Sequence, residues 1–267
     1  MISFPNAKIN LGLSVTSKRS DGFHNLTSIF YPINWCDILE ILPAKETSFS
    51  SSGIKIPGVP ENNLCLKAYE LLREEFSISP VAIHLKKNIP IGAGLGGGSA
   101  DAAFTLKMLN NIFDLNLSPH QLEDRAKLLG SDCSFFIKNK PVIATEKGNI
   151  FENTKLNLTD YYILLVNPGI HISTQGAYNS ISPKERTTDY STIDSVVGTQ
   201  LINDFEESVL SKHKKLKEIK EELQKEAIYT SMTGSGSTIF GIFEKKSIAD
   251  NLKEFYKNYS THIELIS

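Results

Sequence analysis

Pro90-Ile91-Gly92-Ala93-Gly94-Leu95-Gly96-Gly97-Gly98-Ser99 is the stretch that decides the fold of this 267-residue chain. Before it, residues 81–85 alternate between apolar and more polar side chains, which predicts a strand with one buried face. After it, the apolar side chains of residues 102–113 recur at the spacing of one helix face. A strand, a glycine loop (residues 90–99) and a helix are therefore expected in this order.

The glycine loop has the composition of a phosphate-binding segment. Ordering a glycine costs more backbone entropy than ordering any other residue, so five of them between Gly92 and Gly98 need a reason. They suit a backbone that bends sharply and approaches a ligand closely. The helix that starts near Ser99 and Ala100 directs its free N–H groups at the loop, which favours an anion. A flexible linker is the alternative, but linkers are polar on both sides, whereas this loop joins an apolar strand to an amphipathic helix.

The kind of phosphate ligand stays open at this point. Gly92, Gly94 and Gly97 satisfy G-x-G-x-x-G, but a dinucleotide fold needs an acidic residue at the end of a second strand about 20 residues later. Residues 116–124 are instead expected to form a loop and the start of a helix, capped by Ser118. The chain has neither G-K-[ST] nor the signatures of a protein kinase.

Three other features could belong to the same site. A second glycine turn, Met232-Thr233-Gly234-Ser235-Gly236-Ser237-Thr238, precedes an apolar strand, and it is either a structural turn or a second wall of the site. Lys8 interrupts an apolar strand, where a lone lysine is surface in most proteins. Asp132 lies just before two phenylalanines, where a helix cap is the simpler interpretation.

The rest of the chain mixes strands and helices without regular βαβ alternation, which predicts an α+β fold. Residues 147–157 are polar and irregular, so we expect a domain boundary there. Residues 205–224 are expected to form one amphipathic helix. Its Lys/Glu-rich residues, 212–225, are interpreted as a solvated face rather than a binding tail.

Composition limits the function classes. Hydrophobic residues make up 40% of the chain and charged residues 22%, enough for a sizeable core. A net charge of −2 argues against a nucleic-acid partner. The start of the chain lacks the pattern of a signal peptide, and no apolar run reaches the roughly 18 residues of a membrane span, so a cytoplasmic protein is expected. The three cysteines and six histidines show no spacing typical of a metal site.

Three ordered motifs resemble those of the GHMP kinases, the family of galactokinase, homoserine kinase, mevalonate kinase and phosphomevalonate kinase. They are Pro5-Asn6-Ala7-Lys8-Ile9-Asn10-Leu11, residues 92–103 and the second glycine turn. Lys18-Arg19-Ser20-Asp21-Gly22-Phe23-His24, together with residues 96–103, is similar to the branch that acts on 4-diphosphocytidyl-2-C-methyl-D-erythritol. The resemblance implies a two-domain α+β fold with the active site in the cleft between an ATP-binding domain, residues 1–152, and a C-terminal domain, residues 153–267.

This resemblance implies that ATP, with Mg²⁺, phosphorylates the 2-hydroxyl of the methylerythritol part of that substrate, in the non-mevalonate route to isoprenoids. Lys8 and Asp132 match the catalytic positions, and we expect them to lie close together. Ser99 is a candidate contact to metal or phosphate. The residues implied to bind ATP are Pro90, Ile91, Gly92, Ala93, Gly94, Leu95, Gly96, Gly97, Gly98, Ser99 and Ala100, with Asn63 and Lys86 near the adenine.

For the substrate, the resemblance assigns Phe23 and Tyr178 to stacking on cytosine and His24 to its edge. Asn10 and Thr174 are implied as further contacts. Without the resemblance, Phe23 and Tyr178 would more often be core residues.

The chain departs from the family in three places. Phe23 replaces a tyrosine, so stacking survives without the hydroxyl. Cys133-Ser134 replace Val-Pro after the catalytic aspartate, and the glycine-rich element near Gly148 is degenerate.

Several alternatives remain. The chain could be a GHMP kinase for homoserine or mevalonate, a catalytically silent nucleotide-binding module or, least favoured, an NAD-dependent dehydrogenase. The expected partner is a small-molecule substrate, with no nucleic acid and no membrane, for a monomer or homodimer.

Overall fold

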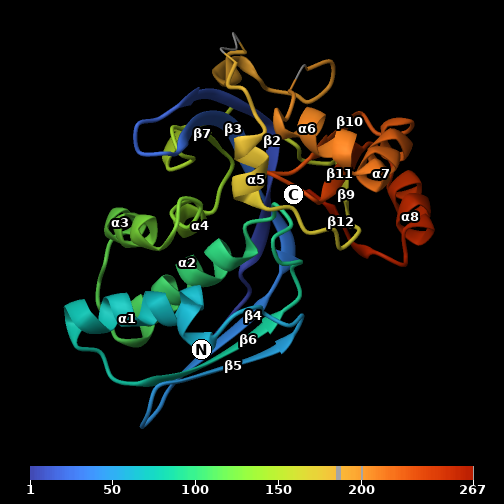
Figure 1. The fold of residues 1–267 in the computed structure, drawn as a ribbon. Helices are drawn as coiled ribbons and strands as arrows, with labels where there is room; N and C mark the ends of the chain where they lie inside the picture. Colours follow the sequence, from blue (N-terminus) through green and yellow to red (C-terminus); the bar gives the residue numbers. More distant parts are fainter. Residues whose placement is uncertain (185–187, 200, 267) are drawn as a thin grey trace. The chain divides into compact units, whose positions relative to one another are not determined.

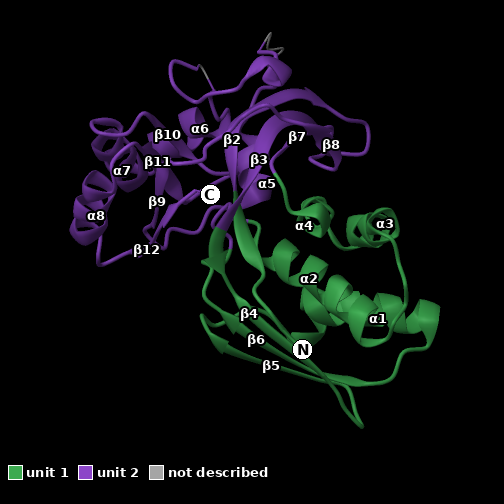
Figure 2. Ribbon diagram, turned by 180° about the vertical axis from the view of Figure 1, so that it is seen from behind, with its two compact units in different colours: residues 1–8, 34–91, 96–140 green, residues 9–33, 92–95, 141–267 purple. Residues whose placement is uncertain are grey.

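The computed structural model describes residues 1–184, 188–199 and 201–266. The chain divides into two compact units (Figures 1 and 2). Unit 1 contains residues 1–8, 34–91 and 96–140, and unit 2 contains residues 9–33, 92–95 and 141–267. Each unit has both strands and helices, so the predicted α+β class is confirmed. The units are interleaved along the chain, and a division after residue 152 stays a prediction.

Unit 1 is a four-stranded sheet with helices on one face (Figure 1). The strand order is β1 (Ile2–Ser3), β4 (Ile38–Pro43), β6 (Val81–Lys87) and β5 (Ser48–Gly53), antiparallel except for the parallel pair β5–β6. The predicted alternation in β6 is confirmed, because Val81, Ile83, Leu85 and Lys87 are buried.

Two helices of unit 1 begin at side-chain caps, of which the Ser118 cap was predicted. In α1 (Leu64–Phe76), the Asn63 side chain accepts a hydrogen bond from the Cys65 N–H at 2.8 Å; a 3₁₀ turn, η1 (Pro60–Asn62), precedes it. The glycine loop leads into α2 (Gly97–Ile112), which packs against α1 and β4. Ser118 starts α3 (Pro119–Leu129) with a full capping box, and α4 (Phe135–Lys138) follows.

Unit 2 contains two sheets. The antiparallel order β10–β11–β9–β12 joins β10 (Tyr229–Met232), β11 (Ile239–Phe243), β9 (Tyr162–Asn167) and β12 (Ser260–Leu265). Helices α7 (Lys214–Gln224) and α8 (Lys246–Phe255) pack on this sheet. The other sheet has the order β2–β3–β7–β8, built from β2 (Asn6–Lys18), β3 (His24–Cys36), β7 (Val142–Thr145) and β8 (Ile150–Asn153). The short helices of unit 2 are α5 (Thr174–Asn179), η2 (Tyr190–Thr192) and α6 (Phe205–Lys212).

Two expectations about local structure need correction, and one strand was missed. Residues 205–224 form two helices, because His213 adopts the non-helical backbone angles φ −124° and ψ 80° between α6 and α7. Residues 147–157 include strand β8, which pairs with β7, so this polar segment is partly a sheet edge. Strand β12 was not expected. The lysines and glutamates of α7 do form a solvated face, since Leu216, Ile219 and Leu223 carry its burial.

Within the described residues, no helix combines the length and the apolar character needed to cross a membrane.

Candidate active site

In unit 1, Lys8 and Asp132 are neighbours, as expected from the sequence. Lys8 lies on β2 with 4% of its side chain exposed, and its Nζ is 3.5 Å from Asp132 Oδ2. Burial lowers the pKa of Lys8, and the Asp132 carboxylate opposes that shift. Asp132 lies in the turn before α4 with 33% of its side chain exposed, so one carboxylate is fixed by a buried cation and still accessible.

The start of α2 lies against this pair. Gly96 has a φ of +70°, and a Cβ there would lie 3.2 Å from Lys8 Cγ and 3.0 Å from the Phe136 ring. Glycine is therefore needed for the helix to begin so close to Lys8. Ser99 hydrogen-bonds the Cys133 thiol, whose pKa burial raises to about 12, so Cys133 stays neutral beside Asp132. Lys8, Asp132, Gly96 and Ser99 thus gather at the N-terminus of a 16-residue helix.

A buried ionic cluster supports the same helix, and the sequence pattern did not predict it. Lys87 pairs with Asp37 and, at 2.6 Å, with Asp101 of α2. Asp37 Oδ1 also accepts hydrogen bonds from the N–H groups of Asn88 (2.6 Å) and Ile89 (2.9 Å), just before the glycine loop. Burial raises the pKa of Asp101 to about 7. The Asp37 carboxylate adds to this shift, because one lysine cannot neutralise two carboxylates. The cluster ties the end of β6 to the first turns of α2.

The two residues that the resemblance places near the adenine, Lys86 and Asn63, both lie in unit 1. Lys86 is exposed and Lys87 is buried, because successive side chains of β6 point to opposite faces of the sheet. Asn63 uses its side-chain oxygen to cap α1. A contact between either residue and adenine stays a prediction.

In unit 2, the tip of the glycine loop contacts the second glycine turn. Gly94 has a φ of +78°, and a Cβ there would lie 2.1 Å from the Thr233 carbonyl oxygen. The Thr233 hydroxyl donates to the Gly94 carbonyl at 3.0 Å, and the Thr238 N–H donates to the Ala93 carbonyl at 3.3 Å. The two glycine segments are therefore in contact at Gly94 and Thr233, and their role as walls of one ligand site stays a prediction.

Asn10 lies beneath this contact and is only 1% exposed. Its N–H donates to the Thr233 hydroxyl at 3.1 Å, and its side-chain amide donates to Ser28 Oγ at 2.9 Å. These bonds give Asn10 a structural position under the second glycine turn. Its predicted contact with the substrate is not tested by this geometry.

Two of the residues expected to bind cytosine, His24 and Tyr178, contact each other in unit 2. The rings of His24 and Tyr178 stack with centroids 5.0 Å apart and 21° between their planes, and Phe205 meets Tyr178 edge-on. Burial lowers the pKa of His24, helped by the charge of Lys18, so a neutral imidazole is favoured. Thr174 lies beside the second glycine turn, with its hydroxyl 3.1 Å from Ser235 Oγ.

Phe23 lies at the surface of unit 2. It is 54% exposed, and the Lys147 ammonium lies 5.0 Å from its ring centre. Gly148 forms the turn between β7 and β8, with a φ of +83° and its N–H donating to the Thr145 carbonyl at 3.0 Å. The hairpin turn accounts for this glycine without a ligand.

Among the residues that the structure describes, no group of three or more His, Cys, Asp or Glu side chains could hold a metal ion.

The matching family descriptions and the similar relatives indicate the same protein family. The family description "GHMP kinases N terminal domain" matches residues 63–140, and "GHMP kinases C terminal" matches residues 192–260. A 4-diphosphocytidyl-2-C-methyl-D-erythritol kinase of Cytophaga hutchinsonii is 54% identical over 255 residues, which covers 92% of this chain and 93% of the relative. The kinase of the same name from Bacteroides thetaiotaomicron is 50% identical over 255 residues, covering 91% and 92%.

The fold comparison extends beyond these relatives. A crystal structure of 4-(cytidine 5'-diphospho)-2C-methyl-D-erythritol kinase superimposes with a TM-score of 0.83 and 27% identity, covering 98% of both chains. The Methanococcus jannaschii mevalonate kinase superimposes with a TM-score of 0.71 at 16% identity, covering 100% of this chain and 98% of the other, a similarity of fold alone.

Proposed function

Because the chain belongs to the GHMP kinase family, we propose that it transfers the γ-phosphoryl group of ATP to the 2-hydroxyl of 4-diphosphocytidyl-2-C-methyl-D-erythritol, a step toward isoprenoid precursors. ATP-dependent small-molecule kinases are what this family contains. The observation that carries the proposal is the Lys8–Asp132 pair at the N-terminus of α2.

Asp132 is the residue that contacts and orients the substrate hydroxyl to be phosphorylated. A carboxylate with an ordinary pKa near 3.9 is a weak base for an alcohol, but phosphoryl transfer has a loose transition state in which little proton removal is needed early. Orientation of the hydroxyl is then the main requirement. Lys8 holds Asp132 in place and offsets negative charge as it develops between the alcohol oxygen and the phosphoryl group.

The glycine loop and α2 bind the phosphates. The first N–H groups of an α-helix lack partners within the helix, and together with its dipole they attract anions. The residues proposed to hold ATP are those at 90–100, with Asn63 and Lys86 near the adenine. Mg²⁺ fits this arrangement, since it needs few protein oxygens beside phosphate oxygens, and Ser99 would hold it. When bound, Mg²⁺ neutralises charge on the transferring phosphates.

The cytidine part is assigned to unit 2. Tyr178, Phe23 and the neutral ring of His24 supply apolar faces and one polar edge for a flat base. Asn10 and Thr174 complete the proposed substrate contacts. We further propose a cytoplasmic monomer or homodimer that binds no nucleic acid.

The test measures ADP release with three alcohols: the diphosphocytidyl alcohol, homoserine and mevalonate. We expect turnover with the first. Activity confined to homoserine or mevalonate would contradict the assigned substrate, and no turnover with any of them, despite ATP binding, would favour the silent nucleotide-binding module.

The role of Asp132 is tested with Asp132→Asn. Loss of the carboxylate should lower kcat by about 10²- to 10⁴-fold and leave ATP affinity largely unchanged. Asp114→Asn is the matched control in unit 1, because Asp114 is exposed and its φ of +47° suits asparagine equally well. Equal kcat values for the two variants would remove Asp132 from the mechanism.

A further inference from the structure

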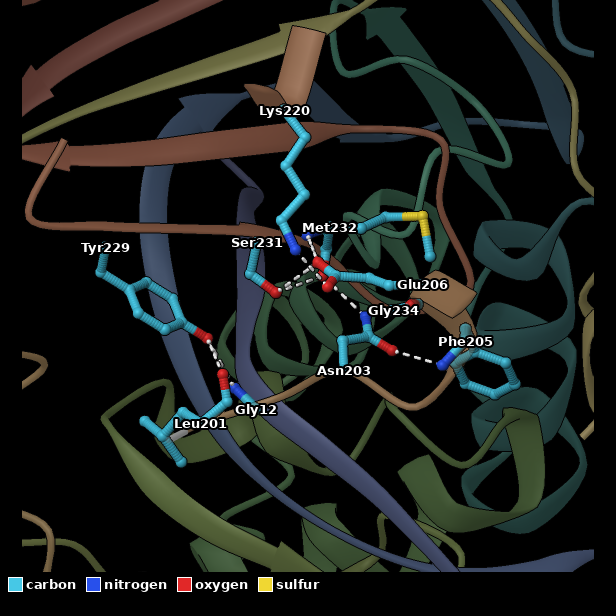
Figure 3. A network of polar contacts seen from close by, with 10 residues as sticks. All are labelled: Gly12, Leu201, Asn203, Phe205, Glu206, Lys220, Tyr229, Ser231, Met232 and Gly234. Carbon is cyan, nitrogen blue, oxygen red and sulfur yellow. Dashed lines mark hydrogen bonds and ion pairs between the residues drawn. The ribbon is translucent and has the colours of Figure 1, made fainter. Parts of the chain in front are cut away.

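The second glycine turn is held from behind by a polar network in unit 2 (Figure 3). Its centre is Asn203, which lies two residues before α6 and is 1% exposed. The Asn203 side-chain amide donates to the carbonyl oxygens of Met232 at 2.7 Å and Gly234 at 2.8 Å. Its side-chain oxygen accepts from the Phe205 N–H at 3.0 Å. One side chain thus spans both sides of Thr233.

Glu206 completes the attachment. Its Oε1 accepts hydrogen bonds from the Met232 N–H at 2.7 Å and from Ser231 Oγ at 3.0 Å, and its Oε2 pairs with Lys220. Both backbone groups of Met232 are therefore bonded to side chains from residues 203–206. This segment lies far from the glycine motifs in sequence, and no motif predicted a role for it.

The network holds the backbone on both sides of Thr233. Because the flanking carbonyls of Met232 and Gly234 are drawn toward Asn203, the Thr233 hydroxyl is left to meet Gly94, to whose carbonyl it donates at 3.0 Å. Gly94 and Gly234 also pack directly, since a Cβ on Gly234 would lie 3.2 Å from the Gly94 Cα. A displacement of the second glycine turn would therefore displace residues 92–95.

We propose that Asn203 is a positioning residue for phosphoryl transfer: it holds the second glycine turn against Gly94 and thereby fixes the phosphate-binding backbone at Gly92–Leu95. The proposal rests on the proposed kinase function for its kinetic consequence. Asn203 acts through Thr233 and Gly94. Its donor atoms are fully used by the two carbonyl groups, so it contacts no ligand in this role.

The decisive variant is Asn203→Asp. It keeps an oxygen for the Phe205 N–H and removes the donor to both carbonyls, so the hydrogen bond at the start of α6 survives while the turn is released. We expect kcat to fall about 10²-fold, as for reacting groups misplaced by about 1 Å, with little change in the KM of the cytidine substrate. Amide hydrogen exchange at residues 92–95 of the ligand-free protein should become faster.

Tyr229→Phe is the matched control. Tyr229 belongs to the same network, where its hydroxyl donates to the Leu201 carbonyl at 3.0 Å and accepts from the Gly12 N–H at 3.2 Å, and neither of these partners is part of the second glycine turn (Figure 3). Its removal should lower Tm without changing kcat or the exchange at residues 92–95. A kcat loss in Tyr229→Phe equal to that in Asn203→Asp would overturn the proposal, because general destabilisation would then explain both.

A parent-like kcat in Asn203→Asp would also overturn it. If that variant fails to fold, Thr233→Val tests the same link, since it removes the hydroxyl that joins the turn to Gly94 at nearly constant volume, and it must show the same loss of kcat and the same faster exchange. If the parent protein fails to phosphorylate the cytidine substrate, the proposed function fails separately, and the exchange comparison alone decides whether Asn203 holds residues 92–95.

Discussion

The contact between Gly94 and Thr233 leaves no room for a side chain, and Gly94→Ala tests this. A Cβ at position 94 would lie 2.1 Å from the Thr233 carbonyl oxygen and 3.3 Å from the Gly236 nitrogen, whereas ordinary contacts are 3.4–4 Å. The two glycine segments must separate by about 1 Å to admit the methyl group. The φ of +78° adds left-handed backbone strain to this overlap.

The destabilisation has two parts. Left-handed geometry costs an alanine about 1 kcal/mol relative to glycine, and forcing a methyl group into a packed site costs about 1–3 kcal/mol. Gly198→Ala is the matched control within unit 2, because Gly198 has a φ of +70° with nothing within 4 Å of its ideal Cβ. This control incurs only the first part. The two variants should therefore differ by about 1–3 kcal/mol, or about 2–6 °C in Tm for a chain of this size.

Differential scanning calorimetry measures that difference, and an ADP-release assay measures its kinetic consequence. A shift of about 1 Å in the phosphate loop should lower kcat/KM by about 10²-fold in Gly94→Ala. Gly198→Ala should retain the parent value. Equal Tm values for the two variants, with unchanged kcat/KM in Gly94→Ala, would refute the tight contact between the loop and the second glycine turn.

Two further predictions concern charge and stacking. Burial raises the pKa of Asp101 to about 7. Between about pH 4 and 7 the folded protein therefore keeps a proton that the unfolded chain has released. Because of this carboxyl, the free energy of unfolding falls as pH rises through that range. Urea unfolding at about pH 5 and 7.5 should show a smaller fall in Asp101→Asn than in the parent, and equal falls would contradict the assignment. Tyr178→Leu removes the ring stacked on His24 and should raise the KM of the cytidine substrate about 10-fold, with the KM of ATP unchanged. Tyr178→Phe should raise it less; an unchanged KM in Tyr178→Leu would exclude Tyr178 from the pocket.

Local sequence patterns were sufficient for the elements around the glycine loop. Alternation in β6, helical spacing in α2 and the Ser118 cap of α3 are each written within a few neighbouring residues, and all were confirmed. The break at His213 was not predictable in this way, because residues 205–224 keep helical periodicity through it. Strand β12 was missed for a related reason: its pairing with β9 depends on residues almost a hundred positions away.

For the site, the order of the residues was enough to name the chemistry available: a glycine-rich anion loop, a second glycine turn, Lys8, Asp132 and candidate aromatic residues. Which of these groups meet depends on the folded arrangement. It places Lys8 3.5 Å from Asp132, presses Gly94 against Thr233, stacks His24 on Tyr178 and buries Lys87 while exposing Lys86. The supporting side chains, Asn203 among them, are visible only there. The physical reason is that turns, caps and periodicity arise from interactions between near neighbours, whereas these contacts arise from the packing of segments far apart in the chain, which no local pattern records.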